Sequence, residues 1–379
     1  MKYLGLDRKS SGMLLRIALM TALLCSRGAA AAERNWTSQD VGHGIASSIA
    51  VDVNQNLHVV YLTSDARLMY AFRPPASEKW FSTTVLASTH ANQHVYPRIA
   101  VDKYDRPHIC VAIGTLEYIT YDGGTWKAQE IDPDSGTLSY HCSVALAPDG
   151  TPHLSWYHEF LPDGKQFSHL RHAELDNGQW VVRSVDGGIS GKWNSMAIDD
   201  KGFAHLVYSQ WAGGSEIRYA AWDGKDWAIG PIATATKTAA ERGYDNSIAI
   251  SPNGMVAVAY FDDANLRYAH IQDGKWVTEK VADVGGRYDY YRGDITVLLD
   301  KDNSPHIIFG DVGALKHAFW DGKQWQVEVI ASGGYSQYAT VGGAIGSDDT
   351  LYVSYSDPTD GGLKVAIGKI VTGSGDTKK

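Results

Sequence analysis

Cysteine is nearly absent from this sequence, with only Cys25, Cys110 and Cys142 among its 379 residues. So few thiols in a chain of this length cannot build a disulfide framework, which excludes a small cross-linked scaffold. We interpret Cys110 and Cys142 as two buried free thiols in neighbouring strands. A disulfide between them is the open alternative, and the fold does not depend on it.

A basic excess is also missing. The chain carries 34 Lys and Arg residues against 43 Asp and Glu residues, a formal net charge of −9. Such a surface repels nucleic acid as a whole, and no basic stripe with interleaved aromatic residues offsets the repulsion. We therefore expect no nucleic-acid partner.

The notable apolar run is confined to the N-terminus. Met13–Leu24 is mostly apolar, basic residues precede it, and Ala29–Ala32 offers a small-residue cleavage site. This order is typical of a secretory signal peptide, and the run is too short to span a bilayer comfortably. We expect residues 1–32 to be removed and the protein to be secreted or periplasmic, with a net charge of −13 because five basic residues and one acid are lost. A lipid anchor on Cys25 is the weaker alternative, since a bulky Leu24 precedes it.

Signatures of common enzyme classes are lacking as well. The sequence has no dinucleotide fingerprint, phosphate loop, nucleophile elbow or zinc-protease helix. We therefore expect no cofactor and assign no metal-binding residues.

The chain does contain a long internal repeat. Seven copies of an apolar strand, a turn and a second apolar strand recur, and a marked position in the second strand falls at His58, His108, His153, His205, Ala257, His306 and Tyr352. The copies are 45 to 52 residues apart, which is the period of a four-stranded propeller blade. A third strand and a tight turn follow, and then a strand led by Trp. The pattern predicts an all-β protein, a seven-bladed β-propeller with four antiparallel strands per blade.

The tryptophan-led strands do not match the blades one to one. Six follow the repeat units, at Trp80, Trp126, Trp180, Trp227, Trp276 and Trp325, and a further copy stands alone at Trp36. We expect this N-terminal strand to complete the last blade near Leu363–Ile370 and close the ring, because separated ends would leave two unpaired edges. The propeller would then span residues 33–371, followed by a disordered polar tail at 372–379.

The repeated residues themselves have a structural interpretation. Histidines spaced one per blade lie around a ring and cannot all meet at one metal ion. We expect the tryptophans to pack blade against blade.

Three turns carry a D-G-x-x-W pattern, at Asp122–Trp126, Asp223–Trp227 and Asp321–Trp325. They resemble degenerate Asp-box (BNR) turns of sialidase-like propellers, which also join the third and fourth strands of a blade. The resemblance to sialidase and polysaccharide-lyase propellers implies the architecture and permits either kind of activity. The full S-x-D-x-G-x-T-W spacing is absent, so no sialidase catalytic residue is carried over.

The loops that link blades, and those between second and third strands, differ in every copy and are rich in aromatic and ionisable residues. Binding residues usually lie on such a face of a uniform scaffold. Our catalytic candidates are His141, Tyr140, Arg292, Tyr291, Asp245 and Asp294. Our substrate-binding candidates are Tyr96, Arg98, His158, Trp193, Trp211, Arg242, Tyr244, Tyr290 and Tyr338. The second-to-third-strand loops add Glu159, Gln210, Asp262, Asp263 and Asp311.

A pocket with several aromatic rings and a few charged groups suits a carbohydrate, because rings stack on sugar faces while charged groups bind hydroxyls or carboxylates. A lyase acting on a uronic acid polymer would use an arginine to neutralise the carboxylate, His141 or a tyrosine as base, and another tyrosine as acid. The arginines available for that role are Arg98, Arg242 and Arg292.

A hydrolase would instead need two carboxylates. The candidates for them are Asp245, Asp294, Asp262 and Glu159. Non-catalytic alternatives are a protein-interaction scaffold and a lectin-like binding module. The blade-linking loops are all unlike one another, which favours one central site over several repeated ones.

Overall fold

The computed structural model of the chain describes residues 33–89, 95–132, 139–160, 167–187, 190–210, 216–234, 246–262, 265–284, 295–311, 313–333, 341–357 and 359–370. Every regular element among them is a β-strand. None of these residues forms a helix long and apolar enough to cross a membrane. The expected signal peptide and polar tail lie outside the described residues and stay predictions.

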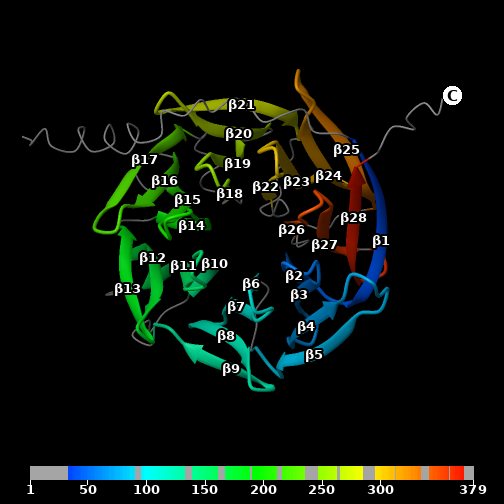
Figure 1. Ribbon diagram of the computed structural model, residues 1–379. Helices are drawn as coiled ribbons and strands as arrows, with labels where there is room; N and C mark the ends of the chain where they lie inside the picture. Colours follow the sequence, from blue (N-terminus) through cyan, green and yellow to red (C-terminus); the bar gives the residue numbers. More distant parts are fainter. Residues whose placement is uncertain are drawn as a thin grey trace, which may run out of the picture.

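Seven sheets of four antiparallel strands stand around a central axis in the described part of the chain (Figure 1). Blades 1 to 3 consist of β2 (Ala46–Val51), β3 (Leu57–Leu62), β4 (Leu68–Arg73) and β5 (Phe81–Leu86); β6 (Arg98–Val101), β7 (Pro107–Ala112), β8 (Leu116–Asp122) and β9 (Thr125–Glu130); and β10 (Ser139–Leu146), β11 (Pro152–Phe160), β12 (Phe167–Asp176) and β13 (Gln179–Asp186).

Blades 4 to 7 complete the ring, and the predicted seven-bladed propeller is confirmed. They consist of β14 (Ser190–Ile198), β15 (Ala204–Gln210), β16 (Glu216–Trp222) and β17 (Trp227–Thr234); β18 (Asn246–Ile250), β19 (Val256–Asp262), β20 (Asn265–Gln272) and β21 (Lys275–Asp283); β22 (Ile295–Leu299), β23 (Pro305–Asp311), β24 (Ala314–Trp320) and β25 (Trp325–Ser332); and β26 (Val341–Ile345), β27 (Leu351–Asp357), β28 (Gly362–Ile370) and β1 (Arg34–His43).

The two ends of the chain meet in blade 7. β1 pairs antiparallel with β28, so that Arg34 lies across from Ile370 and Trp36 across from Gly368 (Figure 1). A Cβ atom at Gly368 would lie 2.7 Å from ring atoms of Trp36, so glycine leaves the room that the indole occupies. The predicted closure by the N-terminal strand is confirmed.

Burial falls from the second strands to the outer strands of the blades. Every residue of β3 and β7 is buried, whereas most residues of the outer strand β9 are exposed. The apolar clusters lie between neighbouring blades, as in the cluster that joins Ile49 and Val59 of blade 1 to Val365 of blade 7. Second strands are therefore nearly continuous apolar runs in the sequence, and fourth strands are not.

Six of the seven tryptophans, all but Trp80, pack against the third strand of the preceding blade. Trp126 meets Tyr70 with ring centroids 5.1 Å apart, and Trp180 meets Tyr118 at 4.9 Å. Edge contacts recur for Trp227 with His172, Trp276 with Tyr219 and Trp36 with His317, and Trp325 meets Tyr268 in a tilted arrangement. Blade-to-blade packing of the tryptophans is as expected.

Four of the repeated histidines, His58, His108, His205 and His306, lie beside the aspartate that begins the first turn of their own blade. In blade 1, Oδ1 of Asp52 accepts hydrogen bonds from the backbone nitrogens of Asn54 and Asn56, each at 2.8 Å. Its Oδ2 accepts from Nε2 of His58 at 3.1 Å, so Nδ1 of His58 is left to accept from the Tyr70 hydroxyl at 2.7 Å. Burial lowers the pKa of His58, which keeps the ring neutral at neutral pH.

Cys110 and Cys142 form a disulfide between β7 and β10, with their Cα atoms 6.2 Å apart. Our interpretation of two free thiols was therefore wrong. Its placement of the residues in neighbouring strands was right, since β7 and β10 belong to adjoining blades. A separation of 32 residues in the sequence gives no sign of the pairing.

Candidate functional site

The inner strands enclose a cavity of about 270 Å³. Its lining comes from all seven innermost strands, β2, β6, β10, β14, β18, β22 and β26, so the cavity lies on the propeller axis. Arg98 is the only charged side chain among the described residues that line it, and His141 supplies the imidazole. The position and the lining make this the candidate site.

A ring of serine hydroxyls holds the inner strands together. Ser48, Ser143, Ser195 and Ser247 stand at one equivalent position in four blades, and each hydroxyl accepts from a backbone nitrogen of the next inner strand. The four pairs, at 2.9 to 3.4 Å, are Ser48 with Ile99, Ser143 with Met196, Ser195 with Ile248 and Ser247 with Val297. These bonds join sheets that have no shared main-chain ladder.

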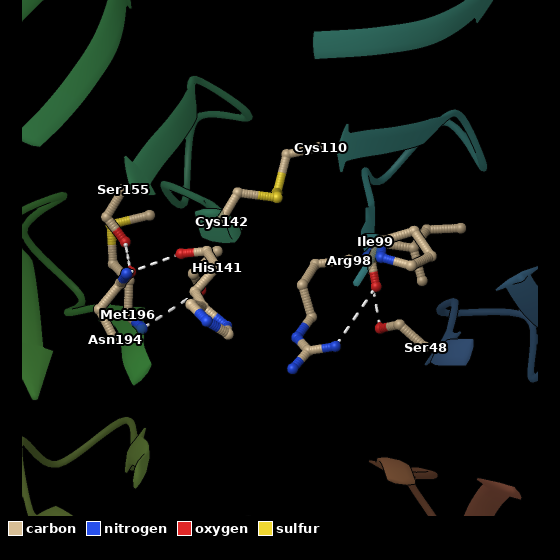
Figure 2. Close-up of a disulfide and its surroundings, with 11 residues drawn as sticks. Ser48, Arg98, Ile99, Cys110, His141, Cys142, Ser155, Asn194 and Met196 are labelled. Atoms are coloured by element: carbon tan, nitrogen blue, oxygen red, sulfur yellow. Dashed lines mark hydrogen bonds between the residues drawn. A yellow bond between two sulfur atoms is a disulfide. The ribbon is translucent and has the colours of Figure 1, made fainter. Parts of the chain in front are cut away.

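Arg98 interrupts this ring. It stands in β6 at the position where the inner strands of four other blades carry Ser and that of blade 6 carries Thr296. A guanidinium has no acceptor atom, so it cannot receive the backbone N–H of the next strand. Its side chain extends instead toward the middle of the propeller, as does that of His141 (Figure 2), with NH1 3.4 Å from the carbonyl oxygen of Pro97. At Arg98 one serine-to-backbone hydrogen bond between inner strands is therefore missing, and a positive charge lies in the cavity instead.

Three rings from consecutive blades lie side by side at this site. Tyr96 stacks on His141, with centroids 5.5 Å apart and planes at 15°, and His141 meets Trp193 at 4.0 Å and 45°. Each of the three residues stands two positions before the Ser or Arg of the inner ring. A row of rings at equivalent positions gives one continuous aromatic surface, which we call the aromatic row.

The backbone under the aromatic row is held in an unusual conformation. His141 and Trp193 have φ values of 51° and 57°, in the left-handed region that costs a residue with a side chain about 1 kcal/mol or more. Nδ2 of Asn194 donates to the carbonyl oxygen of His141 at 2.7 Å, and Nδ2 of Asn246 donates to that of Trp193 at 3.2 Å. The next blade therefore holds the backbone of His141 and of Trp193 in place.

The disulfide joins two positions that are linked by a hydrogen bond in the next pair of blades. Ser155 of β11 donates to Oδ1 of Asn194 at 2.7 Å, which ties the second strand of blade 3 to the inner strand of blade 4. Cys110 and Cys142 stand at the equivalent positions one blade earlier. The disulfide thus fixes β10 at the residue next to His141 (Figure 2).

Carboxylates at the ends of the second strands are engaged in ion pairs. Oδ2 of Asp262 lies 2.7 Å from Nε of Arg267, and Oδ2 of Asp311 lies 2.6 Å from Nζ of Lys316. In both cases the cation stands on the adjoining third strand. These two candidates do not line the axial cavity, nor do Glu159 and Gln210.

His158 also lies apart from the cavity lining. It is buried at the end of β11, with Nδ1 3.7 Å from Oδ2 of Asp132. The same carboxylate oxygen accepts a hydrogen bond from Arg171. Burial and the nearby guanidinium lower the pKa of His158, so its ring stays neutral within an ion-pair cluster.

Several candidates lie outside the described residues, and for Tyr140 only the backbone is described. Those outside are Trp211, Arg242, Tyr244, Asp245, Asp263, Tyr290, Tyr291, Arg292, Asp294 and Tyr338. Among the described candidates, the structure brings Tyr96, Arg98, His141 and Trp193 together.

Sequence reasoning missed the residues that support this group. They are the two asparagines Asn194 and Asn246, the serine ring and the disulfide. An alignment of the seven copies contains part of the signal, because Asn precedes Ser in two consecutive blades and Arg98 is the one charged residue in a column of five Ser or Thr residues and one Gly.

No protein-family model matches the sequence, and no curated protein matches it. Solved structures do share its architecture. The lectin BP39L from Burkholderia pseudomallei has a TM-score of 0.60 at 12% identity, over 88% of this chain and 97% of that one. The polysaccharide lyase Uly1 has a TM-score of 0.58 at 11% identity, over 94% and 95%. These likenesses show the fold.

A propeller with a different number of blades matches over less of the chain. The six-bladed Aleuria aurantia lectin, described with a novel mode of fucose recognition, has a TM-score of 0.52 at 16% identity. The match covers 79% of this chain and 99% of that one.

Proposed function

We propose that the chain binds an acidic carbohydrate at the axial cavity. The observation that carries the proposal is the presence of Arg98 beside the aromatic row of Tyr96, His141 and Trp193. Rings of this kind cover the apolar face of a sugar, and a guanidinium binds a carboxylate or sulfate through two parallel hydrogen bonds. Arg98 also replaces a serine that would serve the fold, which supports a role in binding.

The structural neighbours support a carbohydrate as the ligand, because they include lectins and a polysaccharide lyase. The leader-like segment at residues 1–32 supports a secreted or periplasmic protein that meets polysaccharides outside the cytoplasm. Export and ligand class are parts of the same proposal.

We also propose that the D-G turns are relatives of Asp-box turns. Oδ1 of Asp223 accepts from the backbone nitrogens of Lys225 and Asp226 at 2.8 and 2.7 Å, and Asp321 accepts in the same way from Lys323 and Gln324. Both turns join a third to a fourth strand, the place that the resemblance implies.

Cleavage by β-elimination is the second candidate function. The observation that supports it is that His141 and Arg98 extend toward the same space (Figure 2). Arg98 would neutralise a uronate carboxylate and acidify the adjacent C–H bond. The imidazole of His141 would take that proton as the C–O bond to the next sugar breaks and a C=C bond forms. A tyrosine hydroxyl, with Tyr96 as the described candidate, would protonate the leaving oxygen.

Hydrolysis has less support. It needs two carboxylates flanking the glycosidic bond, and its described candidates are Asp262, which is held by Arg267, and Glu159. Neither lines the axial cavity.

The test uses binding to a panel of polymers. Purified chain is titrated with alginate, polygalacturonate and hyaluronan, and with dextran and mannan as neutral controls. We expect the acidic polymers to bind and Arg98→Ser to weaken their binding by roughly 10-fold to 100-fold, the range for a hydrogen-bonded charge. Because serine is the residue of four other blades, the thermal unfolding of Arg98→Ser should match or exceed that of the wild type.

Equal binding of acidic and neutral polymers would overturn the acidic preference. Binding of no polymer would overturn the proposal and favour a protein-interaction scaffold. Ultraviolet absorbance of unsaturated uronate products tests the elimination separately, with His141→Asn as the inactive control.

A further inference from the structure

We propose that His153, His172 and Glu174 form a binding site for a divalent transition metal ion of the zinc class. One donor atom from each residue lies within 4.8 Å of the other two. Nδ1 of His153 is 3.1 Å from Nε2 of His172 and 4.0 Å from Oε2 of Glu174. Donors bonded to one zinc ion at about 2.0 to 2.2 Å are separated by similar distances, so only small side-chain movements are needed.

Two imidazoles and a carboxylate are a donor set that zinc accepts, with a water molecule as the fourth ligand. The imidazoles are buried, while the side chain of Glu174 is 22% exposed and gives an ion a route to the site. None of the three residues lines the axial cavity. No metal was expected from the sequence, because β11 and β12 bring the donors together only in the sheet.

Comparison of the blades shows that blade 3 departs from blades 1, 2 and 4 at two positions at once. Where blade 3 has His172, blades 1, 2 and 4 have a tyrosine whose hydroxyl bonds to the repeated histidine, namely Tyr70, Tyr118 and Tyr219. Glu174 lies directly across from His153, at a position that holds Phe72, Thr120, Ala221 and Phe319 in blades 1, 2, 4 and 6. Both departures place a metal ligand at the same point.

Blade 6 shows what a histidine pair looks like when it serves only a hydrogen-bond chain. There, Nδ1 of His306 lies 2.9 Å from Nε2 of His317, a contact like that in blade 3. The carboxylates stand at the outer ends of that pair, with Asp300 at Nε2 of His306 and Glu328 at Nδ1 of His317. In blade 3 the carboxylate of Glu174 instead stands beside the shared contact of the two rings, where a metal ion would lie.

One ring nitrogen of the blade 3 pair is unengaged. Nδ1 of His172 is buried and has no hydrogen-bond partner in the described structure. When an ion binds Nε2 of His172, the proton of that neutral ring stands on Nδ1, and no hydrogen bond at that atom is broken.

Arg183 orients the carboxylate. Its NH2 group donates to Oε1 of Glu174 at 2.8 Å, which leaves Oε2 toward the imidazoles. Outer contacts of this kind hold a ligand in place for its metal.

The test measures Zn²⁺ binding to the full chain after treatment with a chelator. We expect isothermal titration calorimetry to show one tightly bound Zn²⁺ per chain, and Co²⁺ in its place to show visible d–d absorption bands. His172→Tyr installs the residue of blades 1, 2 and 4 and should remove binding while preserving the fold. Glu174→Ala, which introduces the residue that blade 4 has at Ala221, should weaken Zn²⁺ binding at least 10-fold.

The matched control is His317→Tyr in blade 6, which changes an equivalent position without touching the three ligands. Binding that persists in His317→Tyr and disappears in His172→Tyr supports the site. Failure of the wild-type chain to bind Zn²⁺ overturns it, as does binding of the same strength in His172→Tyr. Circular dichroism of each variant confirms that a lost signal reflects the site and not unfolding.

Discussion

The indole Nε1 of Trp36 donates a hydrogen bond of 2.7 Å to Oε1 of Glu328, across the boundary between the last two blades. The same oxygen accepts from Nδ1 of His317 at 2.9 Å, and Oε2 accepts from the backbone nitrogen of Arg34 at 3.3 Å. One carboxylate on β25 therefore binds the start of β1. The ring is closed by this polar contact as well as by main-chain pairing with β28.

A single direction of donation satisfies the polar chain behind this contact. NH2 of Arg34 lies 3.4 Å from Nε2 of His306, whose Nδ1 lies 2.9 Å from Nε2 of His317. If both rings carry their proton on Nδ1, Arg34 donates to His306, His306 to His317 and His317 to Glu328. Nε2 of His306 then accepts from Arg34 and makes no hydrogen bond to Oδ2 of Asp300, which lies 3.4 Å away. The chain then begins at a cation and ends at a carboxylate.

Replacement of Glu328 tests this arrangement. The amide oxygen in Glu328→Gln can still accept from Trp36 and His317, so we expect its free energy of unfolding to stay within about 1 kcal/mol of the wild type. Glu328→Ala leaves both donors without an acceptor and should cost about 2 to 3 kcal/mol. Urea unfolding of the three proteins measures the difference, and equal losses for Gln and Ala would contradict the shared acceptor.

The stabilities of the wild type and Glu328→Gln should also depend differently on pH. Burial raises the pKa of Glu328, so the folded chain keeps a proton there at a pH where the unfolded chain has lost it. That contribution to stability is complete below the unfolded pKa and is lost as the pH rises through the folded pKa. The free energy of unfolding of Glu328→Gln should therefore rise relative to that of the wild type as the pH rises through this window.

Much of the fold was predictable because the blade is repeated. The histidine spacing indicates the number of blades, and the unmatched Trp36 indicates the closure, since a missing strand and an extra strand can be counted along the chain. The disulfide was not predictable in this way. Cys110 and Cys142 stand at positions where other blades use Ser and Asn or apolar residues, and only the packing of β7 against β10 shows that they meet.

The candidate site was predicted in part, because the sequence indicates which loops vary but not how their side chains point. Arg98, His141 and Trp193 do meet at the cavity, whereas Asp262 lies in an ion pair with Arg267. That pairing depends on the cross-strand position of the arginine. The sequence contains both residues without showing that their charges cancel.

The disulfide can be replaced by the contact of the next blade. The double variant Cys110→Ser, Cys142→Asn should fold, because Ser155 and Asn194 make the equivalent hydrogen bond. Loss of the cross-link over 32 residues costs about 3.5 kcal/mol, and a new hydrogen bond returns about 1 kcal/mol, so we expect a net loss of about 2 to 3 kcal/mol. Urea unfolding measures it, with Cys110→Ala, Cys142→Ala as the control that should lose more.

Gly342 stands in blade 7 at the position that carries Ser in four other blades, and it lies against the inner strand of blade 1. A Cβ atom there would lie 2.7 Å from Oγ of Ser354 and 2.9 Å from both the backbone nitrogen of Ile49 and Cα of Ser48. Because backbone atoms cannot turn aside, Gly342→Ala should lower the free energy of unfolding by about 1 to 3 kcal/mol. Gly230→Ala is the control, since nothing lies within 4 Å of its added atom, and it should be neutral or slightly stabilising. Equal melting temperatures of the two variants would show that the inner strands can spread.

Because the backbone of His141 has a left-handed conformation, two substitutions there can separate the loss of its ring from a loss of stability. Asn tolerates a φ of 51°, so His141→Asn should keep the melting temperature of the wild type while it removes the ring between Tyr96 and Trp193. We expect the affinity for an acidic polymer to fall roughly 3-fold to 10-fold, the range for one lost aromatic contact. His141→Val removes the same ring but puts a β-branched residue in that backbone conformation, which should lower stability by about 1 to 3 kcal/mol. Thermal unfolding and calorimetric titration of both variants separate the two effects, and unchanged affinity in His141→Asn would remove His141 from the binding surface.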